Sequence, residues 1–115
     1  MKMAGNNGDK SGLLGICRKA GKLKLGMDMA KSACASGEAK AVLAASDIST
    51  KSLKEISYSC GRYGVKLYAL GMTMDSTADA VGKRTGILAV TDAGFAKAFA
   101  KGLTEIETTA AEEIF

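Results

Sequence analysis

Short apolar stretches alternate with helical patterns along this chain, and this alternation limits the folds that are open to it. Residues 39–45 and 87–91 are runs of small and branched apolar side chains, and residues 65–70 alternate like a strand. The segments between them carry apolar residues at helical spacing. Strands that alternate with helices predict an α/β protein in which helices cover both faces of a small sheet.

Five helices are expected, and most of them have a recognisable start or end. In the first helix, the side chains of Leu13, Leu14, Ile16 and Cys17 are expected to face inward. The expected helices are residues 12–20, capped by Ser11 and ended by Gly21; residues 27–36, ended by Gly37; residues 50 to about 60, capped by Ser49 or Thr50 and ended by the Gly61–Gly64 segment; residues 74–81, capped by Thr73 or Asp75; and a last helix capped by Asp92.

The expected domain organisation has three parts. A flexible N-terminal tail, residues 1–10, precedes a single domain over residues 11–102, and an acidic tail follows over residues 103–115. A chain of 115 residues is long enough for one domain with a buried core but not for two. No apolar run approaches the roughly 18 residues that a membrane span needs. A soluble, cytoplasmic protein that is monomeric when free is therefore expected.

Positive charge is concentrated toward one end of the chain. The net charge is +4, but residues 103–115 hold four of the twelve acidic residues and no base, so the rest of the chain carries +8. Residues 1–24 contain six bases and one acid. Such a distribution is typical of nucleic-acid binding, although an ordinary solvated surface explains it about equally well.

Two basic loops are candidates for phosphate contact. Lys22 and Lys24 alternate between Gly21 and Gly26 just before a helix start, where backbone N–H groups and the helix dipole favour anions. The second loop, residues 82–86, reads Gly-Lys-Arg-Thr-Gly. We expect the two loops to lie side by side at one end of the sandwich and to form a single RNA clamp.

Catalytic and metal chemistry find little support. The chain has no histidine, which excludes Ser–His and Cys–His pairs, and residues 82–86 lack the spacing of a phosphate-binding P-loop. Cys17, Cys34 and Cys60 are expected to be buried and reduced rather than zinc ligands. No enzyme, metal site or cofactor is therefore expected. Base stacking on the sheet is also not expected, because Tyr68 is the only aromatic residue on an expected strand.

Several motifs along residues 13–100 share their order and spacing with a known family. They are Leu13-Leu14-Gly15, Arg18-Lys19-Ala20-Gly21-Lys22, Gly26, Ser36-Gly37-Glu38-Ala39-Lys40, Leu43-Ala44-Ala45-Ser46-Asp47-Ile48-Ser49, Ala80-Val81-Gly82-Lys83 and Ala89-Val90-Thr91-Asp92-Ala93-Gly94-Phe95-Ala96. On these motifs the chain resembles the kink-turn-binding ribosomal protein family, of the archaeal seven-Ae and eukaryotic thirty-e type, and most closely its bacterial YlxQ-like branch.

The resemblance implies a three-layer α/β/α sandwich around a mixed sheet of about four strands. It also implies non-catalytic binding of structured RNA, ribosomal RNA or a kink-turn, with ribosomal proteins as possible neighbours. The RNA would contact the start of the second helix and the loop before the last strand. Taking the resemblance and the charges together, the expected RNA-binding residues are Lys22, Lys24, Gly26, Met27, Asp28, Lys31, Lys83, Arg84 and Thr85.

The chain departs from the RNA-reading pattern of that family. The glycine of the pattern is Gly26, but its Asn, Glu and Lys positions hold Asp28, Met29 and Ser32. Asp28 keeps acceptors for guanine N–H groups and adds a charge that repels phosphate, while Met29 is at most a weak acceptor. We therefore expect general RNA contact to be kept and tight recognition of a standard kink-turn to be weakened.

Two other functions remain open. The first is a protein-interaction module on the same fold, with the RNA-reading residues degenerate and the flexible Met27 and Met29 at the docking surface, although core packing is the simpler role for one of them. The second is an accessory substrate-binding part of an RNA-modifying enzyme. The acidic tail, in addition, is a candidate to fold back and screen the basic surface.

Overall fold

The computed structural model describes residues 10–108, which form five helices and five strands. In chain order they are α1 (Ser11–Lys19), β1 (Leu23–Leu25), α2 (Met27–Ser36), β2 (Ala41–Ala44), α3 (Thr50–Tyr63), β3 (Leu67–Ala69), α4 (Met74–Val81), β4 (Ile87–Val90), α5 (Ala93–Gly102) and β5 (Thr104–Ile106). Of the expected N-terminal tail only Lys10 is described, and the expected acidic tail is described as far as Thr108.

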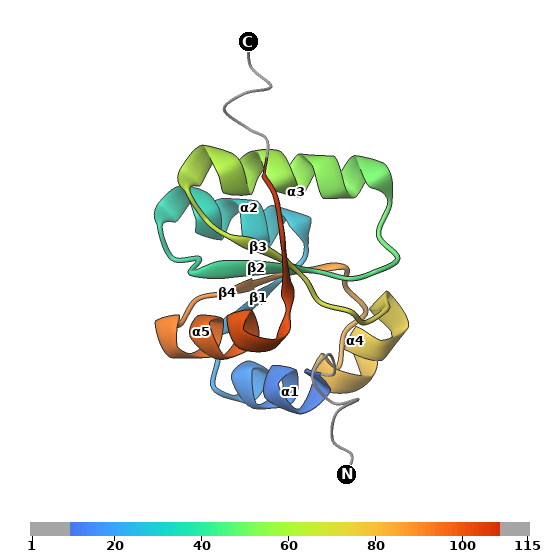
Figure 1. Cartoon of the computed structure of the whole chain (residues 1–115). Coiled ribbons are helices and arrows are strands. Elements are labelled where there is room, and N and C mark those ends of the chain that lie inside the picture. Colours follow the sequence, from blue (N-terminus) through green and yellow to red (C-terminus); the bar gives the residue numbers. More distant parts are fainter. Residues whose placement is uncertain (1–9, 109–115) are drawn as a thin grey trace.

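The strands form one mixed sheet between two layers of helices. Their order is β1-β4-β2-β3-β5, in which β2 and β3 pair in parallel and every other neighbouring pair is antiparallel. Helices α2 and α3 cover one face, and α1, α4 and α5 cover the other (Figure 1). The expected three-layer α/β/α sandwich is confirmed, with five strands in the sheet rather than about four.

Each strand contributes side chains to both layers, because successive residues of a strand point to opposite faces. On β2, Ala41 and Leu43 pack toward α1, α4 and α5, whereas Val42 and Ala44 pack toward α2 and α3. The first core also contains the fully buried Leu14, Cys17, Leu88, Val90 and Phe99, and the second contains Ala30, Ile56, Cys60, Leu67 and Ala89. The helices of the second layer present mostly small residues, so they lie close to the sheet.

Three helix starts are fixed by the side chains expected to cap them. Ser49, Thr73 and Asp92 each accept a hydrogen bond from the backbone N–H three residues further on, at 3.0, 3.1 and 2.9 Å. Each such bond satisfies one of the N–H groups that a helix start leaves without an intrahelical partner.

Helix α1 differs from the expectation at its start and on one face. The Lys10 carbonyl accepts a helical hydrogen bond from the backbone N–H of Leu14 at 2.9 Å, so Lys10 is the N-cap and Ser11 is already helical. Leu14 and Cys17, three positions apart, face the sheet and are buried. Ile16 lies on the other side of the helix and is 61% exposed, so its expected inward position is wrong.

Helix α3 runs past its expected end at Cys60. Gly61 continues the helix and Tyr63 is its last residue. The chain leaves the helix only at Gly64, whose φ of 70° is the left-handed conformation typical of a glycine at a helix end. Arg62 and Tyr63 therefore project from a helix rather than from a loop.

Strand β1 lies inside the segment that was expected to be a basic loop. Leu23 and Leu25 are buried in the first core, and β1 forms one edge of the sheet with Lys24 opposite Ala89 of β4. Because Lys24 alternates with the two leucines, it faces the α2 side of the sheet. The leucines of this segment therefore belong to the core, and Lys24 lies on the opposite face of the strand.

Strand β5 forms the other edge of the sheet, within the residues expected to be an acidic tail. It pairs antiparallel with β3, and Ile106 is half-buried against the second core. Glu105 forms an exposed ion pair with Lys66 at 3.4 Å. The folded part of the chain therefore extends beyond the boundary expected at residue 102.

Candidate nucleic-acid interface

The start of α2 and the loop between α4 and β4 meet at one end of the sheet. The backbone N–H of Gly26 donates to the Ile87 carbonyl at 2.8 Å, and the N–H of Ala45 donates to the Gly86 carbonyl at 2.8 Å. These two bonds tie the α2 start, the α4–β4 loop and the segment after β2 to one another. The start of α2 is therefore bonded to Ile87, the residue that directly follows the second candidate loop.

Gly26 is the N-cap of α2 and has a backbone conformation that favours glycine. Its φ of 98° and ψ of 161° belong to a region that side chains disfavour, so the position calls for glycine. Within residues 10–108 no side chain caps this helix, and a Cβ at Gly26 would meet nothing within 4 Å. The first-turn N–H groups of α2 therefore have no side-chain cap, at the positive end of the helix dipole.

An open hollow of about 460 Å³ lies beside this helix start. Its wall residues come from α2, from the β2–α3 loop and the first turn of α3, and from α4 and the segment that leads into β4. They are Met27, Asp47, Ile48, Ser49, Ser52, Met74, Thr85, Gly86 and Ile87. This hollow and the first turn of α2 together are called the helix-start cleft below.

Gly86 and Thr85 give the cleft its shape. A Cβ at Gly86 would collide with the Ile48 side chain and lie 3.2 Å from the Met74 sulfur, so only glycine lets the loops approach this closely. The Thr85 side chain is buried, and its hydroxyl donates to the Ile87 carbonyl at 3.0 Å. Its carbonyl accepts from the Thr77 hydroxyl at 2.8 Å. Thr85, expected to contact RNA, thus supports the loop from within.

The loop between β2 and α3 is part of the cleft, although sequence reasoning gave it no role. The Asp47 carboxylate accepts a hydrogen bond from the Met74 backbone N–H at 2.9 Å and so links this loop to α4. Residues 46–49 belong to a motif shared with the family, and this was the only signal in the sequence that pointed to them.

The expected cations are distributed over three places. Lys83 is exposed beside the cleft, as is Arg84, whose Nε lies 2.8 Å from the Asp75 carboxylate. The Asp75 carboxylate raises the pKa of Arg84. Lys24 is half-buried on β1, one residue before the strand turns toward Gly26.

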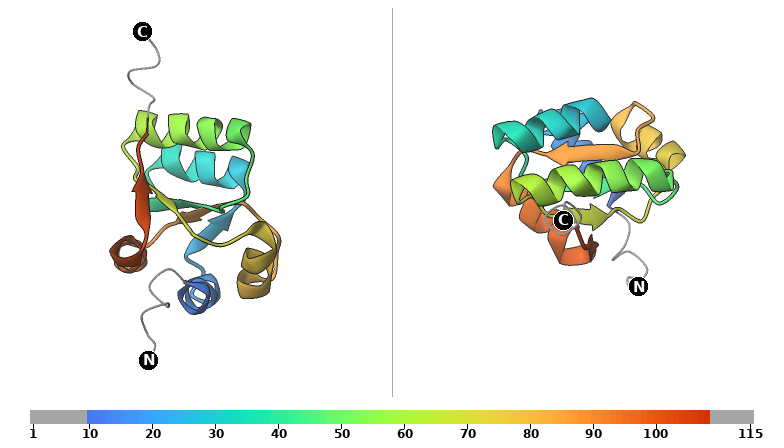
Figure 2. Two further views of the ribbon diagram at one scale, coloured as in Figure 1. Left: turned by 45° about the vertical axis from the view of Figure 1, so that its right-hand side comes forward. Right: turned by 90° about the horizontal axis from the view of Figure 1, so that it is seen from above.

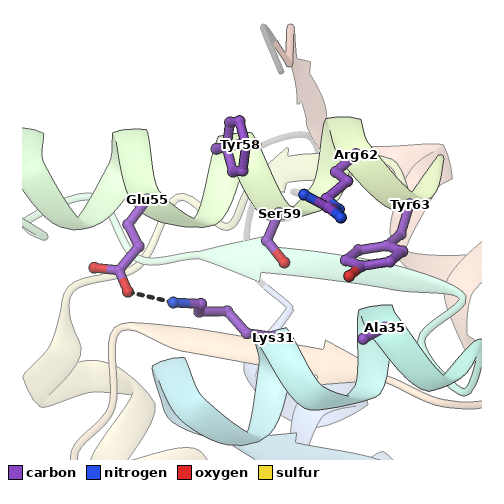
Figure 3. A pocket seen from close by; sticks show the side chains of 7 residues that line it. All are labelled: Lys31, Ala35, Glu55, Tyr58, Ser59, Arg62 and Tyr63. Carbon is purple, nitrogen blue, oxygen red and sulfur yellow. Dashed lines mark hydrogen bonds and ion pairs between the residues drawn. The ribbon is translucent and has the colours of Figure 1, made fainter. Parts of the chain in front are cut away.

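Lys22 and Lys31 lie away from the cleft. The Lys22 carbonyl accepts from the Thr91 N–H at 2.9 Å, at the opposite end of β1, about 13 Å along the strand from Gly26. Lys31, one turn into α2, points to α3, where its ammonium lies 2.7 Å from the Glu55 carboxylate (Figure 3). Glu55 raises the pKa of Lys31. Contact of these two lysines with RNA stays a prediction.

The charges around the cleft nearly balance. The segments around it carry four cations, Lys24, Lys51, Lys83 and Arg84, and three carboxylates, Asp28, Asp47 and Asp75. Asp28 is exposed in the first turn of α2, where a carboxylate stabilises a helix start. Net charge therefore does not mark this end of the molecule as an anion site, whereas the uncapped start of α2 favours anions.

The cysteines are buried, as expected. Burial and, to a smaller extent, the Asp92 carboxylate raise the pKa of the Cys17 thiol to about 11. A side-chain hydrogen bond with Cys34 and burial raise the pKa of Cys60. Over the described range 10–108, there is no group of three or more His, Cys, Asp or Glu side chains that could hold a metal ion. None of the helices in that range is long and apolar enough to cross a membrane.

Fold and site together define a class of protein: a small α/β/α sandwich that presents an open helix start, suited to phosphate, at one end of its sheet. The chain belongs to the Ribosomal protein L7Ae/L30e/S12e/Gadd45 family, which it matches over residues 11–100. This match confirms the family resemblance drawn from the motifs. A comparison with curated protein sequences gives no match.

Solved structures share the fold over most of the chain. A Bacillus halodurans protein of unknown function is 26% identical over 82% of this chain and 95% of that protein, with a TM-score of 0.76. A Giardia lamblia 15.5kD RNA binding protein is 17% identical over 80% of this chain and 82% of that protein, with a TM-score of 0.67. At that lower identity the likeness shows the fold alone.

Proposed function

We propose that the protein is a non-catalytic, cytoplasmic RNA-binding protein, associated with the ribosome, that holds a structured, kink-turn-like RNA at the helix-start cleft. The phosphate backbone contacts the first-turn N–H groups of α2, and Lys24, Lys83 and Arg84 flank it. Met27 and Asp28 face the RNA from the same turn. Thr85 acts by holding the α4–β4 loop in place.

Three observations support this proposal. The family is one of ribosomal proteins, a structural neighbour with the same fold is an RNA-binding protein, and the basic chain carries +8 outside its last thirteen residues. The observation that carries it is the start of α2 at Gly26, where no side chain within residues 10–108 accepts a capping hydrogen bond.

Binding to two short RNAs tests the proposal. The purified protein is titrated with a kink-turn RNA and with a duplex of matched length, at ~150 mM salt, where surface attraction is largely screened. We expect the kink-turn to bind more tightly, with a smaller preference than an Asn–Glu pair would give, because Met29 offers no strong acceptor. Equal, salt-sensitive binding to both RNAs would contradict recognition of shape, and no binding would contradict the function.

A second measurement concerns the ribosome. Cell extract is fractionated on a sucrose gradient at low and at high salt, and the protein is followed by antibody. We expect it to sediment with ribosomal particles at low salt and to leave them at high salt, because its contacts are mainly with phosphate. If the protein stays at the top of both gradients, ribosome association is contradicted. That result would not contradict binding to RNA outside the ribosome.

One exposed side chain favours a protein-interaction module as the second candidate. Met29 is 49% exposed next to the cleft, and flexible exposed methionines are common at protein-docking surfaces. Competition separates the two functions, because structured RNA at physiological salt displaces a partner from an RNA site but leaves a purely protein-binding surface occupied.

A further inference from the structure

A second hollow, of about 410 Å³, lies between α2 and α3 on the outer surface of the sandwich. The two helices run side by side over the sheet (Figures 1 and 2). Figure 3 shows Lys31 and Glu55 meeting across this hollow, with Tyr63 projecting from the end of α3 toward Ala35 of α2 and Arg62 beside Tyr63.

The hollow continues the helix-start cleft. Met27 lines the cleft, and Lys31, four positions on along α2, lines the second hollow. On α3, Ser52 lines the cleft and Glu55 lines the hollow. Helix positions three or four apart share a face, so both hollows lie along one groove between the same two helices. We call this continuation the α2–α3 groove.

Aromatic and guanidinium groups gather in the α2–α3 groove. Tyr58 and Tyr63 are 40% and 44% exposed, whereas Tyr68, the third tyrosine of the chain, is buried in the core. The Arg62 guanidinium carbon lies 5.5 Å from the centre of the Tyr63 ring. Exposed aromatic rings beside an arginine are the groups on which single-stranded nucleic acids stack their bases.

The charge and floor of the groove suit a nucleic-acid strand. Two cations, Lys31 and Arg62, and one carboxylate, Glu55, line the groove, and Glu55 is paired with Lys31. Ala35 and Ser59, both small, contribute to the lining. A peptide helix would need deep apolar pockets for its anchor residues, and the groove offers flat rings and a positive balance instead.

We propose that the α2–α3 groove binds a single-stranded segment of RNA that leaves the structured RNA held at the helix-start cleft. Bases of this segment stack on Tyr58 and Tyr63, and Arg62 contacts the phosphate that joins them. The proposal rests on the proposed RNA-binding function and extends its interface by the length of α3.

Tyrosine fluorescence reports on this groove directly, because the chain has no tryptophan and two of its three tyrosines line the groove. The full chain is titrated with a blunt kink-turn RNA, with the same RNA carrying a short single-stranded uridine extension at either end, and with the uridine oligonucleotide alone. We expect the better-placed extension to raise the affinity by about tenfold or more and to quench tyrosine fluorescence, whereas the blunt RNA leaves the fluorescence nearly unchanged.

Two double variants isolate the stacking. Tyr58→Ala with Tyr63→Ala is expected to abolish the gain from the extension and to leave the affinity for blunt RNA unchanged, because both side chains are exposed. Tyr58→Phe with Tyr63→Phe keeps both rings and is expected to keep the gain. Ile16→Ala removes an exposed apolar side chain on α1 and serves as the control for a general surface effect. Far-ultraviolet circular dichroism verifies that each variant is folded.

Each remaining outcome decides between the proposals. If blunt RNA binds and neither extension changes affinity or fluorescence, the groove proposal is overturned and the proposed function stands. If neither structured RNA binds but the uridine oligonucleotide quenches the tyrosines, the proposed function is overturned and the groove is kept as a single-strand site. If no RNA binds, both are overturned. If a polyglutamate peptide, and no RNA, changes tyrosine fluorescence, the groove docks an acidic protein and the proposal is overturned.

Discussion

Two glycines of the candidate interface are required for different physical reasons. Gly26 needs its positive φ, although a Cβ there would point into open space. Gly86 needs the absence of a Cβ, because the Ile48 side chain fills the place that the Cβ would take. Substitution by alanine should therefore strain the backbone at Gly26 and disrupt packing at Gly86.

We expect Gly86→Ala to lower the free energy of unfolding by about 1–3 kcal/mol, the usual cost of an added methyl group in a tightly packed place. Urea denaturation followed by circular dichroism measures it. Gly12→Ala is the matched control, because Gly12 is exposed in helix α1 with open space around it; there alanine is expected to stabilise by up to about 1 kcal/mol. Equal stability of Gly86→Ala and the wild type would contradict the close approach of the two loops.

The Cys17 thiol makes stability depend on pH. Its pKa is about 11 in the folded protein against an ordinary value of 9.0, so the unfolded chain loses this proton at lower pH. The contribution is fully present below about pH 9 and is lost as the pH rises through about 11. We expect a loss of at most about 2.7 kcal/mol from this group.

Comparison with Cys17→Ala isolates this effect. The variant is less stable at neutral pH because it leaves a cavity, but its stability should fall less steeply above pH 9 than that of the wild type. Urea midpoints are measured for both proteins across this range. Parallel pH profiles of the two proteins would show that Cys17 does not ionise differently in the folded state.

At the scale of elements, the long and periodic segments could be predicted and the short edge strands could not. Helices with a polar cap, such as those that begin after Thr73 and Asp92, can be recognised from the sequence around their first residue. Strand β1 has three residues with a lysine in the middle, and β5 begins with Thr and Glu. These strands form because β4 and β3 offer them unpaired backbone groups. The residues of β4 and β3 lie far away in the sequence, so the residues of β1 and β5 alone do not indicate the pairing.

The site was predictable to the same degree and for the same reason. Gly26 and the α4–β4 loop carry local signals, and the structure brings them together. The side chain of Lys31 points to Glu55, which lies 24 residues away in the chain, and nothing in the local sequence indicates that direction. A glycine's conformation can be read from its neighbours, whereas the direction of a lysine side chain depends on a partner from another helix.

Strand β5 is expected to stabilise the sandwich although it lies at the edge. We expect a chain ending at Leu103 to lose about 2 kcal/mol of stability, because Ile106 no longer covers the second core. It should also aggregate, because the β3 edge is left unpaired. A chain ending at Thr108 keeps β5 and is the control, so thermal unfolding and light scattering of the two are compared. Equal behaviour of both chains would show that β5 contributes nothing.

At the scale of the whole molecule, positive charge and the candidate interface are not in the same place. Arg18, Lys19 and Lys22 lie at the end of α1 and the start of β1, whereas Lys83 and Arg84 flank the cleft at the other end of the sheet. Under the proposed function, the first group attracts RNA at long range and the second group contacts it.

Charge reversal at each end separates these roles. We expect Lys83→Glu to weaken kink-turn binding strongly and to reduce the slope of log affinity against log salt by about one unit, as the loss of one phosphate contact does. Lys22→Glu has the same charge change and is expected to have a smaller effect at physiological salt, because screening acts over about 8 Å. A larger effect of Lys22→Glu would move the interface to the α1 end of the sheet.

Strand β5 follows every other element of the sandwich along the chain, and it runs from α5 in one helical layer to α3 in the other (Figure 1). During synthesis both layers and four strands have left the ribosome before β5 emerges, and until then the β3 edge is open to strands of other chains. The interval in which a nascent chain is exposed to mispairing thus lasts until residues 104–106 have reached the β3 edge and paired with it.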